Sequence, residues 1–290
     1  MASKFKIIRY ADLHLHTDYS DGVYSPRKIV AKAKGLGLSA ISITDHDILD
    51  GIKPAIDAGL EYGVEVIPGV ELSAKAYDWE IHILGYYINR DDENFQNQIS
   101  VFREARKFRA MEMVDKLNDL GIDIDYDDVF KQEERVDSIG RPHVASALME
   151  KGYVGTKQEA FDRFLFHNGP AYVPKKKLSP QEAIAMILNV GGIPVMAHPG
   201  MMMQGIIPEL VSMGLMGVEV YHPNHSSQDS DYLARVAKEY NLLITGGSDY
   251  HGGFKSSMGS IKLPYEHVEA LKEARNYISE KINTALDFYK

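Results

Sequence analysis

Short apolar runs alternate with amphipathic helical patterns in both the N-terminal and the C-terminal thirds of the chain. Seven of the apolar runs are predicted strands. Several of them lack an apolar/polar alternation, which is expected when protein covers both faces of a strand. The predicted strands are Ile7–Asp12, Ala40–Thr44, Glu65–Val70, Ile81–Tyr87, Ile193–Ala197, Gly217–Tyr221 and Leu242–Gly246.

Helical patterns fill the segments between these strands. A strand followed by a helix, repeated along the chain, is the pattern of a parallel α/β barrel. The predicted helices of the barrel are Pro26–Lys34, Ile52–Tyr62, Pro180–Val190, Gly205–Met213, Gln228–Tyr240 and Tyr265–Lys281.

The alternation is interrupted by residues 91–178, which are helical by pattern. The sequence therefore predicts a barrel formed by residues 1–90 and 179–290, with 91–178 as a helical insertion that recognises substrate or forms a lid. The helices expected in the insertion are Phe95–Leu120, Tyr126–Lys131 and Pro142–Lys151.

Composition narrows the classes of function. The chain contains no cysteine, which excludes disulfides and thiolate metal sites and leaves His, Asp and Glu as ligands. Its net charge of -9 disfavours binding to long duplex nucleic acid but not to a small phosphorylated molecule. No run approaches the roughly 18 apolar residues of a membrane span. We expect a cytoplasmic protein without membrane association, and no obligatory protein partner is evident.

Acidic or imidazole side chains lie in or directly after all seven predicted strands. Barrel enzymes build their active sites at the C-terminal ends of the strands. His14 and His16 are separated by one residue, so in a strand both would point to one face, with Leu15 on the other. Nine side chains are candidate metal ligands: His14, His16, Asp21, His46, Glu71, His82, His198, Asp249 and His251.

These residue types indicate the kind of metal and the chemistry. Imidazole and carboxylate suit manganese, iron and zinc, and we expect manganese first. Nine ligands exceed the needs of one ion, so two or three divalent ions are implied, with Glu71 placed to bridge. Such a centre lowers the pKa of a bound water and neutralises phosphoryl oxygens. Hydrolysis of a phosphate ester by metal-activated hydroxide is the predicted reaction.

Five segments together resemble the PHP (polymerase and histidinol phosphatase) superfamily, and they occur in the order typical of that family. The resemblance covers Tyr10 to about Arg90 and Pro194 to about Gly259. Its motifs are Asp12-Leu13-His14-Leu15-His16, Thr44-Asp45-His46-Asp47, Gly69-Val70-Glu71-Leu72-Ser73, Ala197-His198-Pro199-Gly200 and Ser248-Asp249-Tyr250-His251.

The resemblance implies a distorted seven-stranded (β/α) barrel with a trinuclear metal centre. Carried onto the matching positions, the first metal takes His14, His16, Glu71 and Asp249. The second takes Glu71, His82 and His198, and the third takes Asp21, His46 and His251. An intact ligand set argues against the PHP domains that persist only as structural parts of polymerases.

Three further segments resemble the stand-alone bacterial subgroup that acts on 3',5'-bisphosphonucleotides and, in some members, trims short RNA from the 5' end. They are Glu80-Ile81-His82-Ile83-Leu84-Gly85-Tyr86, Gly140-Arg141-Pro142-His143-Val144-Ala145 and Glu219-Val220-Tyr221-His222-Pro223. Proline in a first helical turn places free backbone N–H groups beside Arg141 and His143, which suits a phosphate. Arginine can bind it bidentately.

The function expected from these residues is removal of the 3'-phosphate from nucleoside 3',5'-bisphosphates. Arg141 and His143 would bind a second phosphate, and His225 would contact a phosphate or ribose. The candidate catalytic residues are Asp45, Glu71 and Asp249, with the general acid left open among Asp45, Asp249, His222, His225 and water. The alternatives are a histidinol-phosphate phosphatase, a 5'-3' exonuclease on short RNA, and a non-catalytic nucleotide-binding module.

Overall fold

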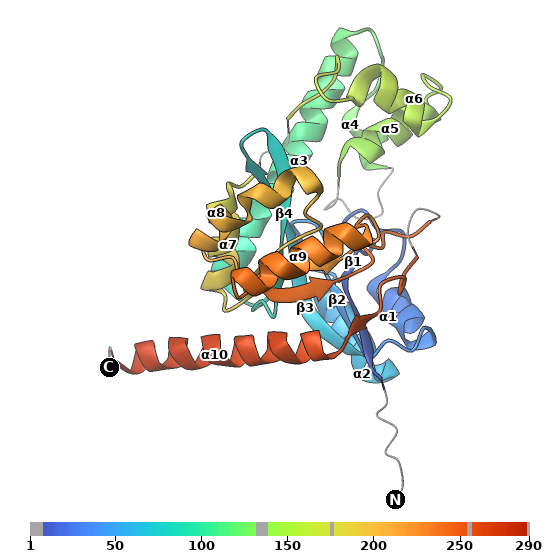
Figure 1. Cartoon of the computed structure of the whole chain (residues 1–290). Helices are drawn as coiled ribbons and strands as arrows, with labels where there is room; N and C mark the ends of the chain where they lie inside the picture. Colours follow the sequence, from blue (N-terminus) through green and yellow to red (C-terminus); the bar gives the residue numbers. More distant parts are fainter. Residues whose placement is uncertain (1–7, 132–138, 175–176, 254–256, 289–290) are drawn as a thin grey trace, which may run out of the picture. The chain divides into compact units, whose positions relative to one another are not determined.

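The computed structural model describes residues 8–131, 139–174, 177–253 and 257–288, so Ile7 of the first predicted strand lies outside it. The chain divides into two compact units (Figure 1). The first comprises residues 1–96 and 177–290, and the second comprises residues 97–176.

The first unit contains an eight-stranded sheet that forms a nearly closed barrel, in the order β7-β6-β5-β4-β3-β2-β1-β8. The segment after β7 lies beside the end of β1, because the His16 N–H donates to the Tyr250 carbonyl at 3.0 Å. The expected barrel-type α/β fold is therefore confirmed. The strands are β1 (Tyr10–Leu15), β2 (Ala40–Ile43), β3 (Glu65–Ala76), β4 (Trp79–Tyr86), β5 (Ile193–Met196), β6 (Gly217–Tyr221), β7 (Leu243–Gly246) and β8 (Leu263–Pro264).

Strand β4 runs antiparallel to both β3 and β5, so the expectation of a wholly parallel barrel is wrong at this strand. The cause is the connection: only Tyr77 and Asp78 separate the end of β3 from the start of β4. A two-residue loop can join antiparallel strands but not parallel ones, which need a long crossover. As a result, His82 near the beginning of β4 pairs with Ser73 near the end of β3.

The two-residue strand β8 was not predicted. It pairs antiparallel with the first two residues of β1, joining Tyr10 to Pro264 and Ala11 to Leu263. Two residues are too few to carry a detectable apolar/polar alternation, so only the folded chain reveals this strand.

Apolar side chains of helices pack against the strands of the barrel unit. In the cluster around α1 and β2, Ile29 and Val30 pack with Ile41 and Ile43, and all four are fully buried. The predicted Gly205–Met213 helix is two shorter pieces, a 3-10 turn η3 (Met201–Ile206) and then α8. The helices are α1 (Pro26–Gly35), α2 (Ile52–Tyr62), α7 (Pro180–Asn189), α8 (Ile207–Ser212), α9 (Ser227–Glu239) and α10 (Glu266–Phe288).

The second unit is helical and has a hydrophobic core of its own. Met113 and Leu117 pack in one cluster with Val144 and Leu148, and each is exposed by 1% or less. Its short α6 and the π-helical turn η2 were not predicted. The helices are α3 (Glu93–Asp119), which begins in the first unit, α4 (Tyr126–Phe130), α5 (Arg141–Glu150), α6 (Lys157–Ala160) and η2 (Phe161–Leu165).

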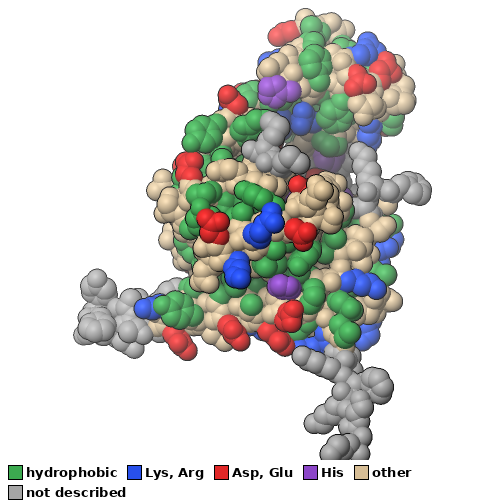
Figure 2. All heavy atoms as spheres, in the orientation of Figure 1, with side chains coloured by type: hydrophobic (Ala, Val, Ile, Leu, Met, Phe, Trp, Pro, Cys, Tyr) green, Lys and Arg blue, Asp and Glu red, His purple; other side chains and the backbone are tan. Residues whose placement is uncertain are grey.

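Charged side chains of both signs are interspersed with apolar ones on the face drawn in Figure 2. Binding to long nucleic acid requires an extended basic surface, and this face does not carry one. Among the described residues, no helix combines the length and the apolar character needed to cross a membrane.

Candidate metal centre

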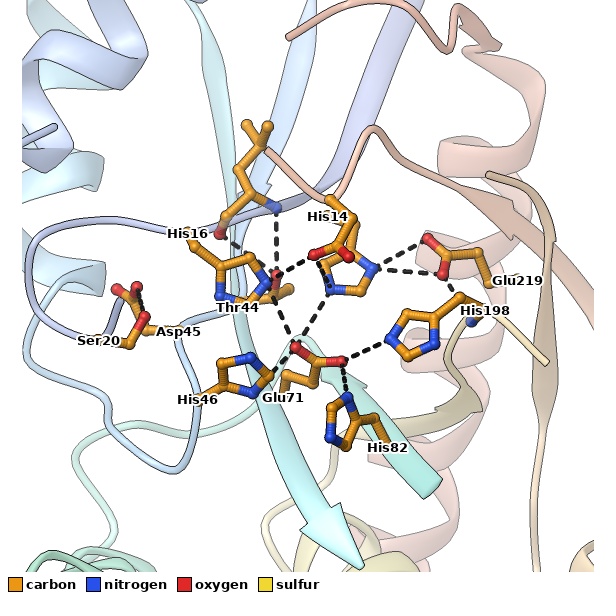
Figure 3. Close-up of polar contacts among 12 residues, drawn as sticks. His14, His16, Ser20, Thr44, Asp45, His46, Glu71, His82, His198 and Glu219 are labelled. Atoms are coloured by element: carbon orange, nitrogen blue, oxygen red, sulfur yellow. Dashed lines mark hydrogen bonds and ion pairs between the residues drawn. The ribbon is translucent and has the colours of Figure 1, made fainter. Parts of the chain in front are cut away.

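Five imidazole rings surround the buried carboxylate of Glu71 (Figure 3). They are divided between its two oxygens. Oε2 lies 3.3 Å from His14 Nε2, 3.3 Å from His16 Nε2 and 3.1 Å from His46 Nδ1. Oε1 lies 2.8 Å from His82 Nδ1 and 3.1 Å from His198 Nε2. Glu71 is thus the residue that connects one side of the cluster with the other.

Strand β1 runs beyond the predicted end at Asp12, so it contains His14 and places His16 directly after its last residue, Leu15. Leu15 between them is buried in the cluster with Ile29, while both histidines face Glu71 on the opposite side. The end of β7 passes close to this strand, because a Cβ on Gly247 would lie 2.3 Å from His14 Cβ. Glycine at this position lets the two backbones approach closely enough to bring the following loop to the site.

Two aspartates complete the cluster from loops on either side of β1. Asp249 Oδ1 lies 3.1 Å from His16 Nε2 and 3.4 Å from His14 Nε2. Asp21 Oδ1 lies 3.2 Å from His251 Nε2, and Asp21 Oδ2 lies 3.8 Å from His46 Nε2. All nine candidate ligands therefore gather at one end of the barrel.

Two of these candidates adopt a left-handed backbone, His198 with φ 26° and Asp249 with φ 49°. Residues other than glycine in this region cost about 1–3 kcal/mol and persist where the surroundings hold them. Such backbone strain gathers at functional sites. His198 is the second residue after β5 and Asp249 the third residue after β7, and the side chains of both face the cluster.

Three overlapping groups of side chains bring their ligand atoms within 4.8 Å of one another. The first matches the expected set of His14, His16, Glu71 and Asp249. The other two groups differ from the expected sets, because one also contains His16 and the other contains His46 in place of His198. The other two groups are His16, Asp21, His46 and His251, and His46, Glu71 and His82. His198 lies beside the last of these, on the same Glu71 oxygen as His82.

The spacing of the ligand atoms suits divalent cations bound between them. Within the described part of the chain, His14 Nε2, His16 Nε2 and Glu71 Oε2 are buried and make no hydrogen bond. A buried polar atom without a partner is costly, and native proteins normally satisfy it. Imidazole nitrogens and a carboxylate oxygen that face one another at 3.3 Å can all be satisfied by a divalent ion.

Charge coupling among these side chains is strong. Burial lowers the pKa of His16, but the neighbouring carboxylates of Asp249 and Glu71 outweigh it and raise this pKa to about 10. His82 behaves in the same way, because Glu71 raises its pKa to about 9 against the effect of burial. Burial instead dominates at His46 and lowers its pKa to about 3. Without metal, carboxylates therefore hold protons on several of the imidazoles that would bind the ions.

Glu219 is a buried member of the site that the sequence did not single out. Its two oxygens lie 3.1 and 3.2 Å from His14 Nδ1, and Oε2 also accepts from the His198 N–H at 2.8 Å. A carboxylate on Nδ1 fixes the ring so that Nε2 faces the metal, an arrangement usual for metal-binding histidines. The available signal was a lone acidic residue inside the apolar strand Gly217–Tyr221.

Asp45 faces away from the ligand groups (Figure 3). Its buried carboxylate accepts hydrogen bonds from the Thr17 N–H at 2.7 Å, the Thr17 hydroxyl at 2.6 Å and the Ser20 hydroxyl at 2.6 Å. These contacts fix the loop that carries Asp21. The structure thus places Asp45 as an acceptor for the loop after β1, in none of the three ligand groups.

The two histidines after β6 differ in their closeness to the ligands. His222 is buried, and its Nε2 lies 3.5 Å from Asp249 Oδ2. His225 is half-buried, with Nδ1 2.9 Å from the Val220 carbonyl and its ring 5.4 Å from that of His222. The structure brings neither histidine into a ligand group.

Arg141 and His143 begin α5 in the second unit. His143 Nδ1 accepts from the Gly140 N–H at 3.0 Å, which leaves the proton of the neutral ring on Nε2. Arg141 donates to the Leu165 carbonyl at 3.3 Å, and its guanidinium lies 5.6 Å from the centre of the Phe161 ring. Both side chains therefore make hydrogen bonds within their own unit, Arg141 as a donor and His143 as an acceptor.

A barrel whose strand ends place imidazoles around a central buried glutamate is typical of metal-dependent hydrolases. Comparison with known proteins gives the family. The PHP domain family matches residues 12–150 of the chain. The chain belongs to the PHP family, and it is a metal-dependent phosphoesterase.

Three curated relatives match over most of their length. A phosphoribosyl 1,2-cyclic phosphate 1,2-diphosphodiesterase from Eggerthella lenta is 31% identical, covering 84% of this chain and 94% of the relative. A 5'-3' exoribonuclease from Haemophilus influenzae is 33% identical, covering 83% and 89%. A 3',5'-nucleoside bisphosphate phosphatase from Chromobacterium violaceum is 29% identical, covering 83% and 86%.

A solved structure agrees with the fold. A protein from Bifidobacterium adolescentis, assigned to the metal-dependent phosphoesterases, superposes with a TM-score of 0.82 at 31% identity. The match covers 92% of this chain and 96% of that protein. The fold and the family assignment are therefore consistent.

Proposed function

We propose that this phosphoesterase removes the 3'-phosphate from nucleoside 3',5'-bisphosphates. The observation that carries the proposal is the set of overlapping ligand groups around Glu71, since adjacent ions can hold the oxygens of one transferring phosphoryl group. The Chromobacterium violaceum relative, named for this substrate class, supports the choice of substrate.

The proposed centre contains three divalent ions, with manganese the first candidate and iron or zinc the alternatives. His14, His16, Glu71 and Asp249 would hold the first, Glu71, His82 and His198 the second, and Asp21, His46 and His251 the third. When bound, the ions would lower the pKa of a water to supply hydroxide and neutralise the phosphoryl oxygens.

The roles proposed for the carboxylates follow from their contacts. Glu71 spans two ligand groups and keeps them adjacent, and Asp249 joins His14 and His16 from the opposite loop. We propose that Asp45, a catalytic candidate in the sequence, acts by holding the loop after β1 through Thr17. His222 remains a candidate proton donor to the leaving group, because it lies close to Asp249.

Arg141 and His143 are proposed to bind the phosphate that is not cleaved. Support comes from their place in the first turn of α5, at the positive end of the helix dipole, which favours a bound anion. A substrate with one phosphate to hold and another to cleave gains positioning energy that a simple monoester lacks. His225 remains a proposed contact for ribose or phosphate.

The test is a phosphate-release assay with added Mn²⁺ and with chelator. The substrates are adenosine 3',5'-bisphosphate, adenosine 3'-monophosphate and histidinol phosphate. We expect metal-dependent release that is fastest from the bisphosphate. Preference for histidinol phosphate would refute the proposed substrate class, and release that persists in chelator would refute the role of the metal centre.

Exonuclease action on short RNA is the second candidate, and the Haemophilus influenzae relative favours it. A 5'-phosphorylated trinucleotide in the same assay separates the two functions. Stepwise appearance of mononucleotides from the 5' end would assign the exonuclease. An intact trinucleotide together with rapid turnover of the bisphosphate would assign the phosphatase alone.

A further inference from the structure

A pocket of about 410 Å³ opens beside the metal centre within the barrel unit. Its walls come from the start of β4, the end of β5 and the segment that leads into η3. The volume lies in the range of small-molecule sites, roughly 300–1,000 Å³. The main side chains of the lining are Trp79, Ile81, His82, His198, Pro199 and Met203.

Two residues of the pocket lining, His82 and His198, are candidate metal ligands. His82 and His198 contact the same oxygen of Glu71, and their rings lie 5.2 Å apart (Figure 3). The pocket is therefore continuous with the place proposed for the phosphoryl group. A phosphate ester bound at the ion proposed for these histidines would direct the rest of its molecule away from Glu71, and the pocket is the adjoining space.

The rest of the lining is largely apolar. Trp79 is 44% exposed, whereas its neighbour Ile81 is buried. Glu80, an acidic residue of the lining, is paired with Lys177, whose Nζ lies 2.7 Å from Glu80 Oε2. An apolar chamber with one aromatic ring at its wall suits a flat group with π faces, and bases stack on tryptophan in this way.

A half-exposed tryptophan at a hairpin is by itself ordinary. Trp79, however, lies at the wall of a pocket beside the metal centre. Trp79 pairs with Ala76 beside the two-residue turn, so the antiparallel hairpin fixes the indole at the pocket wall two positions before Ile81 and three before His82. Ribose alone separates the base of a nucleotide from its 3'-phosphate, so a nucleotide whose phosphate lies beside His82 and His198 would extend its base into this pocket.

We propose that this pocket binds the nucleobase of the substrate, with the base stacked on Trp79. The proposal rests on the proposed function, because it identifies the leaving group as a nucleoside. It adds a source of specificity: the metal centre recognises the phosphate, and the pocket distinguishes a nucleotide from a sugar phosphate of equal charge.

Kinetics of Trp79→Ala and Trp79→Phe test the stacking. The substrates are adenosine 3',5'-bisphosphate and its abasic analogue, in which hydrogen replaces the base. We expect Trp79→Ala to lower kcat/KM for the nucleotide by roughly tenfold or more and to leave the abasic substrate unchanged, with Trp79→Phe retaining most of the preference. Tyr232→Ala, which removes a similarly exposed aromatic ring from α9, should change neither substrate.

The outcomes separate the two proposals. If the wild type cleaves neither bisphosphate but hydrolyses other monoesters, the proposed function fails, and the nucleobase site fails with it. If the wild type prefers the nucleotide and Trp79→Ala keeps that preference, the nucleobase site alone is wrong.

Fluorescence of the unmodified protein gives a second measurement that needs no variant. Trp79 is the chain's single tryptophan, so the indole emission reports on this position alone. Saturable quenching by adenosine and none by ribose is expected for a base stacked on the indole. Emission unchanged by adenosine would overturn the stacking.

Discussion

Replacing Glu219 by glutamine tests whether the buried carboxylate behind His14 prepares the metal site. The change keeps the size of the side chain and removes its charge. In the native protein, this carboxylate is the acceptor for both His14 Nδ1 and the His198 N–H. It therefore supports two candidate ligands from strands on different sides of the barrel.

The expected magnitude follows from counting acceptors. An amide offers one acceptor oxygen and directs its NH₂ group at whatever lies on the other side. Either His14 or the His198 N–H then faces a donor instead of an acceptor. Substitution of such supporting partners typically costs 10- to 100-fold in metal affinity. We expect Glu219→Gln to lower affinity by about tenfold, and Glu219→Ala, which removes both acceptors, by about 100-fold.

Calorimetric titration of the metal-free protein with Mn²⁺ measures the effect directly, and the metal content of the dialysed protein provides a check. Glu239→Gln, at an exposed glutamate at the end of α9, is the matched control and should leave affinity unchanged. An affinity of Glu219→Gln within twofold of the wild type would refute the positioning role. A control that loses as much affinity would show that the effect is not local.

Three other changes test separate parts of the site. Because the pKa of His16 is raised to about 10 and that of His82 to about 9, both rings must lose a proton when metal binds. Mn²⁺ affinity should thus rise by at least about tenfold per pH unit from pH 6 to 8, and a flat profile in calorimetry would contradict the coupling. Asp45→Asn should lower the free energy of unfolding in urea by about 1–3 kcal/mol, because buried donors lose their carboxylate; lost turnover at unchanged stability would instead indicate a chemical role. Arg141→Ala should raise KM roughly tenfold for adenosine 3',5'-bisphosphate and little for the 3'-monophosphate, and equal effects would exclude phosphate anchoring.

The i, i+2 spacing predicted that His14 and His16 point to one side, because the alternation of side chains along an extended chain depends only on the backbone. His14 and His16 therefore share a face as expected, with Leu15 in the core. The predicted strand ended too early, at Asp12, whereas β1 reaches Leu15. The direction of β4 was not predicted, because the strand run was taken to begin at Ile81, whereas β4 begins at Trp79. The longer β3 and β4 leave only two residues for the turn, and this length alone decides that the pair is antiparallel.

Sequence also could not separate carboxylates that bind metal from carboxylates that hold loops. Asp45 follows β2 as closely as Asp249 follows β7. The carboxylate of Asp45 nevertheless accepts hydrogen bonds from Thr17 and Ser20, which belong to the loop after β1. Glu219 lies within an apolar run where nothing in the pattern names its partner. Both roles depend on donors brought from distant positions, so they become visible only in the folded chain.

Buried carboxylates connect neighbouring strands around the metal centre. Each accepts a backbone N–H from an adjacent strand or loop, at 2.7 to 2.9 Å: Ser248 to Asp12, Thr17 to Asp45, Ser73 to Asp47 and His198 to Glu219. Hydrogen bonds to a charged acceptor are the strong ones in proteins, and burial shields them from water. The loops that carry the ligands are thus held by the protein itself. Metal ions would then bind to donors that are already in place. Substitution of Glu219, which contacts the ring of a candidate ligand, should therefore act on metal affinity, whereas substitution of Asp45, which contacts Thr17, should act on stability.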